Sequence, residues 1–280
     1  MPTLIDTSQS LARIGAIAAF VGALVLLVST LLHPLSADPN DPPAAFAEYA
    51  ADRLWVWSHL GQFIGFAVLL VALVALAATL EAGGAAAWGR IGVAGATATI
   101  AAAAALQAVD GVALKAVVDR WAAAPADARA LAFEAALAVR QIEIGLASLL
   151  SLSAGLTLCV FGLAIFRSSQ YPAWFAGVGL VGGLGTIAAG AEQAATGFSA
   201  VAMTLSMLAS LVLLLWACLA GALLWRLAPC LADDELASRR GNQLHDGRPV
   251  SAMGTTAGSL AARTWRGSKS ATPRLPAALT

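Results

Sequence analysis

Long apolar runs alternate with short polar segments along the first 226 residues of the chain. A helix needs about 20 predominantly apolar residues to cross the hydrocarbon region of a bilayer. Six runs approach this length and carry charges only at their ends: residues 14–32, 60–80, 91–109, 144–166, 173–191 and 201–225. The pattern predicts an all-α fold, a polytopic bundle of six membrane-spanning helices.

The first run resembles a signal peptide in its position, but its length argues against that interpretation. The apolar region of a signal peptide is about 7–15 residues long. Residues 14–32 exceed this length, and Arg13 is the one basic residue before them. We therefore expect a retained helix. The chain divides into an N-terminal segment (1–13), a transmembrane domain (14–226) and a tail (227–280).

Two segments outside the spans have distinct compositions. Residues 111–140 are rich in alanine on both sides of Pro125, and alanine has the highest helix propensity. This segment predicts two short helical extensions that cap the bundle. After Pro229, Ser, Gly, Thr, Arg and Pro become frequent and large apolar residues rare. Such a composition cannot bury enough surface to order itself, so the tail is expected to be disordered.

The composition places the protein in a bilayer. The chain is 59% hydrophobic and 11% charged, with a mean hydropathy of +0.79, which excludes an ordinary soluble enzyme. Alanine supplies 67 of the 280 residues, and small residues suit close helix contacts in lipid. The net charge is zero, so no basic excess indicates a nucleic-acid partner. Membrane lipid is the expected partner.

The distribution of charge predicts the orientation. Residues 1–226 carry nine basic and twelve acidic groups and residues 227–280 seven and four, so the zero is a sum of −3 and +3. Basic residues near helix ends are retained on the cytoplasmic side. One set of helix ends carries Arg13, Arg90, Arg167 and Arg226. We therefore expect both termini in the cytoplasm and the protein in the inner (plasma) membrane, with Trp55, Trp57 and Trp121 at the outer interface.

Polar residues gather at the opposite helix ends. Ionisable groups near hydrocarbon are expensive unless they face a partner or a wet cavity, so their collection at one depth predicts a polar pocket that opens outward. His33, His59, Gln62, Asp110, Glu143 and Glu192 are the candidate ligand-pocket residues, with Lys115 and Arg140 as possible counter-charges.

Helical spacing groups these residues further. His59 and Gln62 are three residues apart, as are Gln107 and Asp110, so each pair shares a helix face. Glu143, Ala147 and Ser151 repeat every four residues toward the midplane. Gly61 and Gly65, and again Gly179 and Gly183, have the spacing of small residues that allows helix backbones to approach closely.

Several interpretations of the polar group remain open. In a structural one, Asp110 and Glu143 pair with Lys115 and Arg140, Glu192 caps a helix, and the histidines bond backbone carbonyls. In a second, His33 and His59 bind haem or a metal with Glu143 or Glu192.

In a third interpretation, Glu143 or Glu192 is the general acid of an intramembrane enzyme that acts on a lipophilic substrate. In a fourth, the pocket binds or transports a small or lipophilic ligand without covalent chemistry. The sequence assigns no catalytic residue, no metal-ligand motif and no cofactor.

Several short segments resemble those of a bacterial family of six-helix integral membrane proteins known as a domain of unknown function. These segments are His33-Pro34, Trp57 to Gln62, Val109 to Lys115, Ile142 to Gly145 and Tyr171 to Gly177. The resemblance spans roughly residues 10 to 226. It implies a six-helix fold and suggests that His59, Asp110 and Glu143 belong to the family pattern, but it implies no activity.

Overall fold

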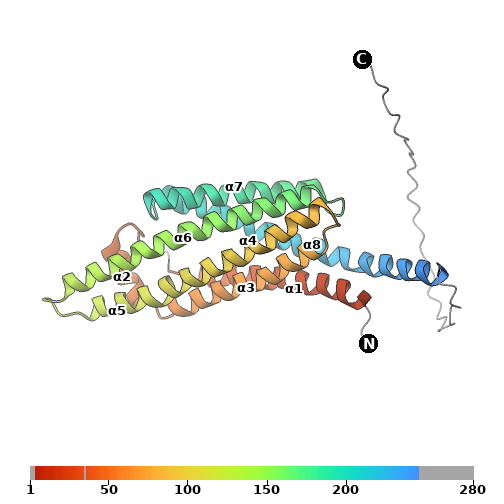
Figure 1. Cartoon of the computed structure of the whole chain (residues 1–280). Coiled ribbons are helices and arrows are strands. Elements are labelled where there is room, and N and C mark those ends of the chain that lie inside the picture. Colours follow the sequence, from red (N-terminus) through yellow and green to blue (C-terminus); the bar gives the residue numbers. More distant parts are fainter. Residues whose placement is uncertain (1–3, 35, 246–280) are drawn as a thin grey trace, which may run out of the picture. The chain divides into compact units, whose positions relative to one another are not determined.

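The computed structural model of the protein describes residues 4–34 and 36–245 (Figure 1), and all its regular elements are helical. They are α1 (Leu4–Leu31), α2 (Pro42–Ala51), α3 (Trp55–Ala78), α4 (Gly84–Gln107), the π-helix η1 (Ala108–Leu114), α5 (Lys115–Ala123), α6 (Arg129–Phe166), α7 (Ala173–Thr196) and α8 (Ala200–His245).

Within the described residues, six helical segments are long and apolar enough to cross a membrane, which confirms the predicted architecture. The spans are Ser8–Leu31, Trp55–Ala78, Gly84–Ala123, Arg129–Phe166, Ala173–Thr196 and Ala200–Leu231. Successive spans run in opposite directions. We name the two ends of the bundle. At the polar end, α1 and α7 finish and α3, α6 and α8 begin. The opposite end is the arginine end.

The expected helical extensions are present at the polar end as continuations of two spans. Helix α4 passes through η1 into α5, and α6 begins 15 residues before Ile144, at Arg129. Pro125 lies in the turn between α5 and α6, where its missing N–H costs no helical hydrogen bond. Figure 1 shows α5 and the start of α6 side by side beyond α3.

Helix α2 was not predicted from hydropathy. Asp41 caps it by accepting a hydrogen bond from the backbone N–H of Ala44 at 3.4 Å, and two prolines follow in its first turn. Phe46 and Tyr49 on α2 pack with Trp55 and Trp121 in a small apolar core at the polar end. This core positions the start of α3 against η1 and α6.

The tryptophans at the polar end divide into two kinds. Trp57 is 69% exposed, as expected of an interfacial side chain, whereas Trp55 is 1% and Trp121 8% exposed. The last two are core residues, and their prediction as interfacial aromatics was wrong. The small core that α2 forms with the helical extensions covers them.

The start of the predicted tail is also corrected. Helix α8 continues past the expected boundary at 227 and through Pro229 to His245. Residues 231–245 still contain the helix formers Ala, Leu, Glu and Arg, whose propensity the apolar count overlooked. The rest of the expected disordered tail, residues 246–280, lies outside the described residues.

Small residues bring the spans together. An added Cβ at Gly65 on α3 would lie 3.0 Å from the backbone nitrogen of Leu26 on α1, and one at Gly183 on α7 would lie 2.7 Å from the carbonyl oxygen of Gly155 on α6. These contacts confirm the predicted role of both glycine pairs in packing. Toward the arginine end, Phe161, Phe175 and Trp216 fill the largest apolar core.

Candidate functional site

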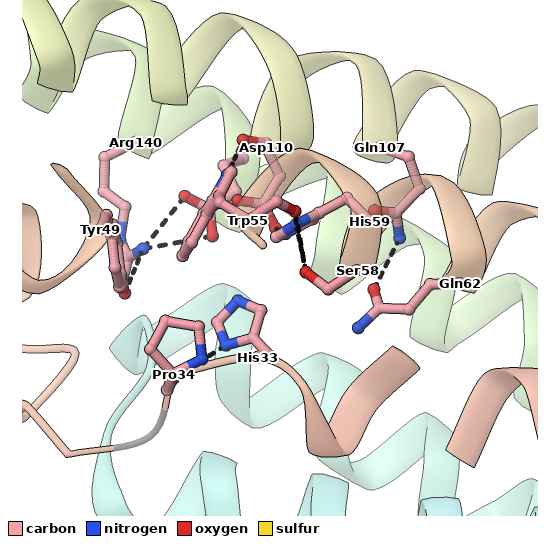
Figure 2. Close-up of polar contacts among 11 residues, drawn as sticks. His33, Pro34, Tyr49, Trp55, Ser58, His59, Gln62, Gln107, Asp110 and Arg140 are labelled. Carbon is pink, nitrogen blue, oxygen red and sulfur yellow. Dashed lines mark hydrogen bonds and ion pairs between the residues drawn. The ribbon is translucent and has the colours of Figure 1, made fainter. Parts of the chain in front are cut away.

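Most of the predicted polar residues meet at the polar end, where α1 ends, α3 begins, η1 interrupts a span and α6 crosses. Figure 2 shows the contact of Arg140 with Tyr49 on one side and that of Gln62 with Gln107 on the other, with His59 and Asp110 between them. We call this group, together with His33, Trp55, Ser58 and Glu143, the polar cluster.

His59 is the centre of the polar cluster. Its Nε2 atom lies 3.0 Å from Oδ2 of Asp110 on η1, and its Nδ1 atom lies 2.6 Å from the carbonyl oxygen of Trp55. The His59 side chain is 2% exposed and that of Asp110 14%. The indole Nε1 of Trp55 donates in turn to the backbone oxygen of Asp110 at 3.0 Å. Two opposed contacts therefore join α3 to η1.

The hydrogen-bond partners fix the proton count of this pair. A backbone carbonyl can only accept, so Nδ1 of His59 carries a hydrogen. The contact between Nε2 and Asp110 then needs one further proton, bound either to the imidazole or to the carboxyl group. A single proton therefore joins His59 and Asp110 in a hydrogen bond whose nitrogen and oxygen atoms are 3.0 Å apart.

His33 lies beside this pair. Its ring centroid is 5.1 Å from that of His59 and 4.7 Å from the ring of Trp55. Its Nδ1 donates to the carbonyl oxygen of Pro34 at 2.8 Å. Burial and the neighbouring His59 lower the pKa of His33 below its usual 6.5, against the opposing effects of Asp110 and Asp52. At neutral pH its Nε2 therefore presents a lone pair.

Arg140 closes the other side of the cluster. Its NH1 donates to both carboxylate oxygens of Glu143, at 3.3 and 3.2 Å, and to the hydroxyl of Tyr49 at 3.1 Å. Its NH2 donates to the carbonyl oxygen of Pro39 at 3.1 Å. The guanidinium carbon also lies 4.6 Å from the centre of the Phe198 ring. Arg140 thus connects Glu143 to α2, to the loop at Pro39 and to the loop at Phe198.

The structural interpretation expected Lys115 to be a partner of Asp110. The structure shows that the two do not pair. Nζ of Lys115 donates to the carbonyl oxygens of Tyr49 and Ala50, at 2.9 and 3.0 Å, and to Asp119 at 2.8 Å. The ammonium therefore satisfies the last carbonyls of α2, a favourable position for a cation at a helix C-terminus. Asp110 is left to His59.

The two glutamines at the inner edge of the cluster are partly satisfied. Nε2 of Gln107 donates to Oε1 of Gln62 at 3.1 Å. The Oε1 atom of Gln107 and the Oδ1 atom of Asp110 are buried and accept no hydrogen bond from any residue that the structure describes. Gln107 and Asp110 are three residues apart, so two unpaired acceptors stand on neighbouring turns of one span.

The π-helical winding of η1 and one glycine shape this part of the site. An added Cβ at Gly111 would lie 2.5 Å from Cβ of His59, so no larger residue fits without moving α3. A π-helical turn contains an extra residue and occurs frequently at functional sites. Here the turn supplies both Asp110 and the close approach at Gly111.

Glu192 does not join the polar cluster. Its side chain accepts from the hydroxyl of Thr196, one turn later on α7, at 3.2 Å. This contact lies at the last turn of the helix and is not an N-cap. The other five pocket residues lie in the cluster, and the prediction that the histidines bond backbone carbonyls is confirmed for both.

Five participants were not predicted from the sequence: Tyr49, Trp55, the Pro39 carbonyl, Phe198 and Ser58. The hydroxyl of Ser58 donates to the carbonyl of Trp55 at 2.8 Å and lies 3.3 Å from Nδ1 of His59. The sequence Asp41-Pro42-Pro43 was a usable signal for a helix start, and so for α2 and Tyr49. Nothing in the sequence indicated that Pro39 and Phe198 approach Arg140.

The donor set bears on the metal interpretation. Among the residues that the structure describes, no three His, Cys, Asp or Glu side chains are grouped so as to hold a metal ion. Both nitrogens of His59 have partners within the protein. The described residues therefore offer no support for a haem or metal centre at His33 and His59.

Comparison with known proteins adds no functional assignment. No family model, curated protein or solved structure matches the chain. The resemblance to the six-helix family stays a prediction, and the polar cluster is the feature that bears on function.

Proposed function

We propose that the protein is a multi-pass protein of the inner membrane, with both termini in the cytoplasm, that binds a small ligand at an outward-facing polar cluster. The positions of Arg13, Arg90, Arg167 and Arg226 at the opposite helix ends support this orientation. The ligand-binding part rests on one observation. The buried oxygens Oδ1 of Asp110 and Oε1 of Gln107 have no hydrogen-bond donor among the described residues.

Unpaired buried acceptors are costly and define the chemistry of what would satisfy them. Leaving such an oxygen unsatisfied costs about 1–3 kcal/mol, and more for a charged group. A partner for Asp110 and Gln107 must donate hydrogen bonds, so the ligand carries a hydroxyl or an ammonium group. The remaining charges are already paired within the cluster, as in Arg140 with Glu143. Such a ligand therefore needs no further charged partner.

An experimental structure of the protein purified from its membrane tests this proposal. We expect density larger than a water molecule within hydrogen-bond distance of Oδ1 of Asp110 and Oε1 of Gln107. Asp110→Leu and Gln107→Leu should each remove it, whereas Gln141→Leu, at an exposed position on α6, should leave it in place. Ordered water alone at both oxygens would overturn the proposal.

A second candidate function is acid–base catalysis, which the shared proton of His59 and Asp110 favours. The pair holds one proton, and neutral His33, at a ring distance of 5.1 Å, offers a lone pair to receive another. This assigns proton transfer to the histidines and Asp110. Glu143 is engaged through both oxygens with Arg140 and is a less suitable proton donor.

Substitution separates the two functions. If the cluster only binds, His33→Gln should preserve retention of the bound ligand. If it catalyses proton transfer, His33→Gln should leave the ligand bound but unconverted, which mass spectrometry of the extracted ligand detects. Identical ligand from wild type and variant would reject the catalytic candidate.

A further inference from the structure

An apolar cavity lies within the membrane-spanning part of the bundle. It has a volume of about 80 Å³ and is lined by residues of α1, α3, α4, α6 and α8. Phe66, Leu70, Ile100, Leu158 and Leu213 are among these residues. A cavity of about 150 Å³ with similar walls stays dry and binds benzene. The present cavity is smaller, so it accommodates only a short segment of a hydrocarbon chain.

Three side chains in the cavity wall carry a polar group: Thr99, Thr157 and Trp216. The hydroxyl of Thr99 donates to the carbonyl of Gly95 at 2.9 Å and lies 3.2 Å from the hydroxyl of Thr157. The indole nitrogen of Trp216 lies near Gly179, where an added Cβ would lie 2.8 Å from it, and it has no hydrogen-bond partner among the described residues. Apart from this one N–H donor and the two threonines, the wall is apolar, so its chemistry selects a hydrocarbon chain.

The same helix faces carry both the cavity and the glutamines of the polar cluster. On α3, Gln62 is followed by Phe66 and Leu70 at intervals of four residues, and the last two line the cavity. On α4, Gln107 is preceded on the same face by Ala103 and Ile100, and Ile100 lines the cavity. Four residues of helix rise about 6 Å. The Gln62–Gln107 contact thus lies within one to two helical turns of the cavity wall.

We infer that the ligand is a single-chain amphiphile, with a hydroxyl or ammonium headgroup at Asp110 and Gln107 and its hydrocarbon chain in the apolar cavity. This inference rests on the proposed binding function and adds the class of ligand. The headgroup supplies the donors that the two buried oxygens lack. The chain fills a space that water would not occupy. Phe66 packs against the apolar layer around Ala103 and Leu106 and also lines the cavity, so it stands between the two parts.

Photolabelling with a synthetic amphiphile tests the inference. The probe is 1-octanol with a photoreactive diazirine in its chain, applied to the full-length protein in detergent micelles, and labelled peptides are identified by mass spectrometry. We expect labels on α3, α4 and α6 near Leu70, Ile100 and Leu158. The same chain with a methyl ether in place of the hydroxyl should label these positions roughly tenfold less, because one strong hydrogen bond is lost.

Matched variants separate chain from headgroup. Ala154→Leu and Ala96→Leu place a larger side chain in the cavity wall, whereas Ala101→Leu adds the same bulk at an exposed position of α4. Asp110→Leu and Gln107→Leu remove the headgroup acceptors. We expect labelling by the alcohol to fall roughly tenfold or more in the cavity and headgroup variants, and to be unchanged in Ala101→Leu. Thermal unfolding of each variant shows whether it is folded.

The pattern of losses distinguishes failure of the proposed binding function from failure of the amphiphile inference. If only the headgroup variants lose labelling, the proposed binding function stands and the amphiphile inference is overturned. If only the cavity variants lose it, the cavity takes hydrocarbon without the cluster, and both proposals fail. If folded variants of both kinds label as the wild type does, both proposals fail as well.

Discussion

His59 and Asp110 lie on different helices, yet Nε2 of His59 is 3.0 Å from Oδ2 of Asp110. The contact is possible because Gly111 has no side chain and the π-helical η1 turns Asp110 toward α3. Since the imidazole also donates to the carbonyl of Trp55, it is held on both sides. This arrangement makes the pair both a structural link and the only titratable contact between α3 and η1 within the described residues.

We expect Asp110→Leu to lower the free energy of unfolding by about 1–3 kcal/mol, because it leaves Nε2 of a buried imidazole without a partner. Asp110→Asn should cost less, since its amide can donate to the neutral ring. Unfolding in mixed micelles with increasing SDS measures both. Asp119→Leu, which breaks only an exposed pair with Lys115, should change stability by less than about 1 kcal/mol. Equal losses in the Leu and Asn variants would argue against the hydrogen bond.

The buried pair of Arg140 and Glu143 gives a larger effect. Their side chains are 5% and 4% exposed, so Arg140→Met leaves a buried carboxylate unpaired and should cost about 3–5 kcal/mol. The double variant Arg140→Met, Glu143→Leu removes both charges and should recover part of this loss. Arg129→Met, at an exposed position, is the control. The same SDS titration applies, and a double variant no more stable than Arg140→Met would show that the unpaired charge is not the cause.

The spans could be predicted from sequence because bilayer thickness imposes a length and an apolar composition that are visible in one dimension. The Arg140–Glu143 pair was also accessible, since residues three apart share a helix face. The partner of Asp110 was not. It depends on a π-helical turn and on a glycine contact with another helix, neither of which has a hydropathy signal. The same holds for Pro39 and Phe198, which approach Arg140 only through folding of the loops.

Gly111 offers a sharp steric test. Gly111→Ala places a methyl group 2.5 Å from Cβ of His59, and such overpacking typically costs about 1–3 kcal/mol. Gly145→Ala is a matched control, because a Cβ there meets no atom within 4 Å and alanine favours a helix by up to about 1 kcal/mol. We expect the first variant to unfold at lower SDS and the second to be neutral or stabilised. Equal behaviour of the two would contradict the close approach of α3 to η1.

The lowered pKa of His33 predicts a dependence of stability on pH. Burial first and the charge of His59 second lower this pKa below 6.5 in the folded protein, with Asp110, Asp52 and the Pro34 carbonyl opposing them. The unfolded chain therefore binds a proton on His33 more readily than the folded one. The stability contributed by the neutral ring is present above pH 6.5 and is lost as the pH falls below it.

The measurement is the melting temperature of the detergent-solubilised protein between pH 8 and pH 5, on either side of the usual histidine pKa of about 6.5. We expect a decline on the acidic side that is smaller in His33→Gln, which cannot take up the proton. His245→Gln, which removes another of the three histidines of the chain, is the control. An identical decline in wild type and His33→Gln would assign the effect to other groups.

The predicted orientation is tested by labelling of single cysteines in intact cells. With Cys159, Cys218 and Cys230 replaced by alanine, we expect Ala47→Cys on α2 to react with a membrane-impermeant maleimide added outside. Gln170→Cys, in the loop between α6 and α7 at the arginine end, should react only after the membrane is permeabilised. Both positions are exposed, so access from the two sides decides the result. The reverse pattern would place the polar cluster in the cytoplasm. Such a reversal would put the four arginines at the outer helix ends, against the charge bias that orients membrane proteins. The experiment therefore also tests whether that bias or the cluster determines the orientation.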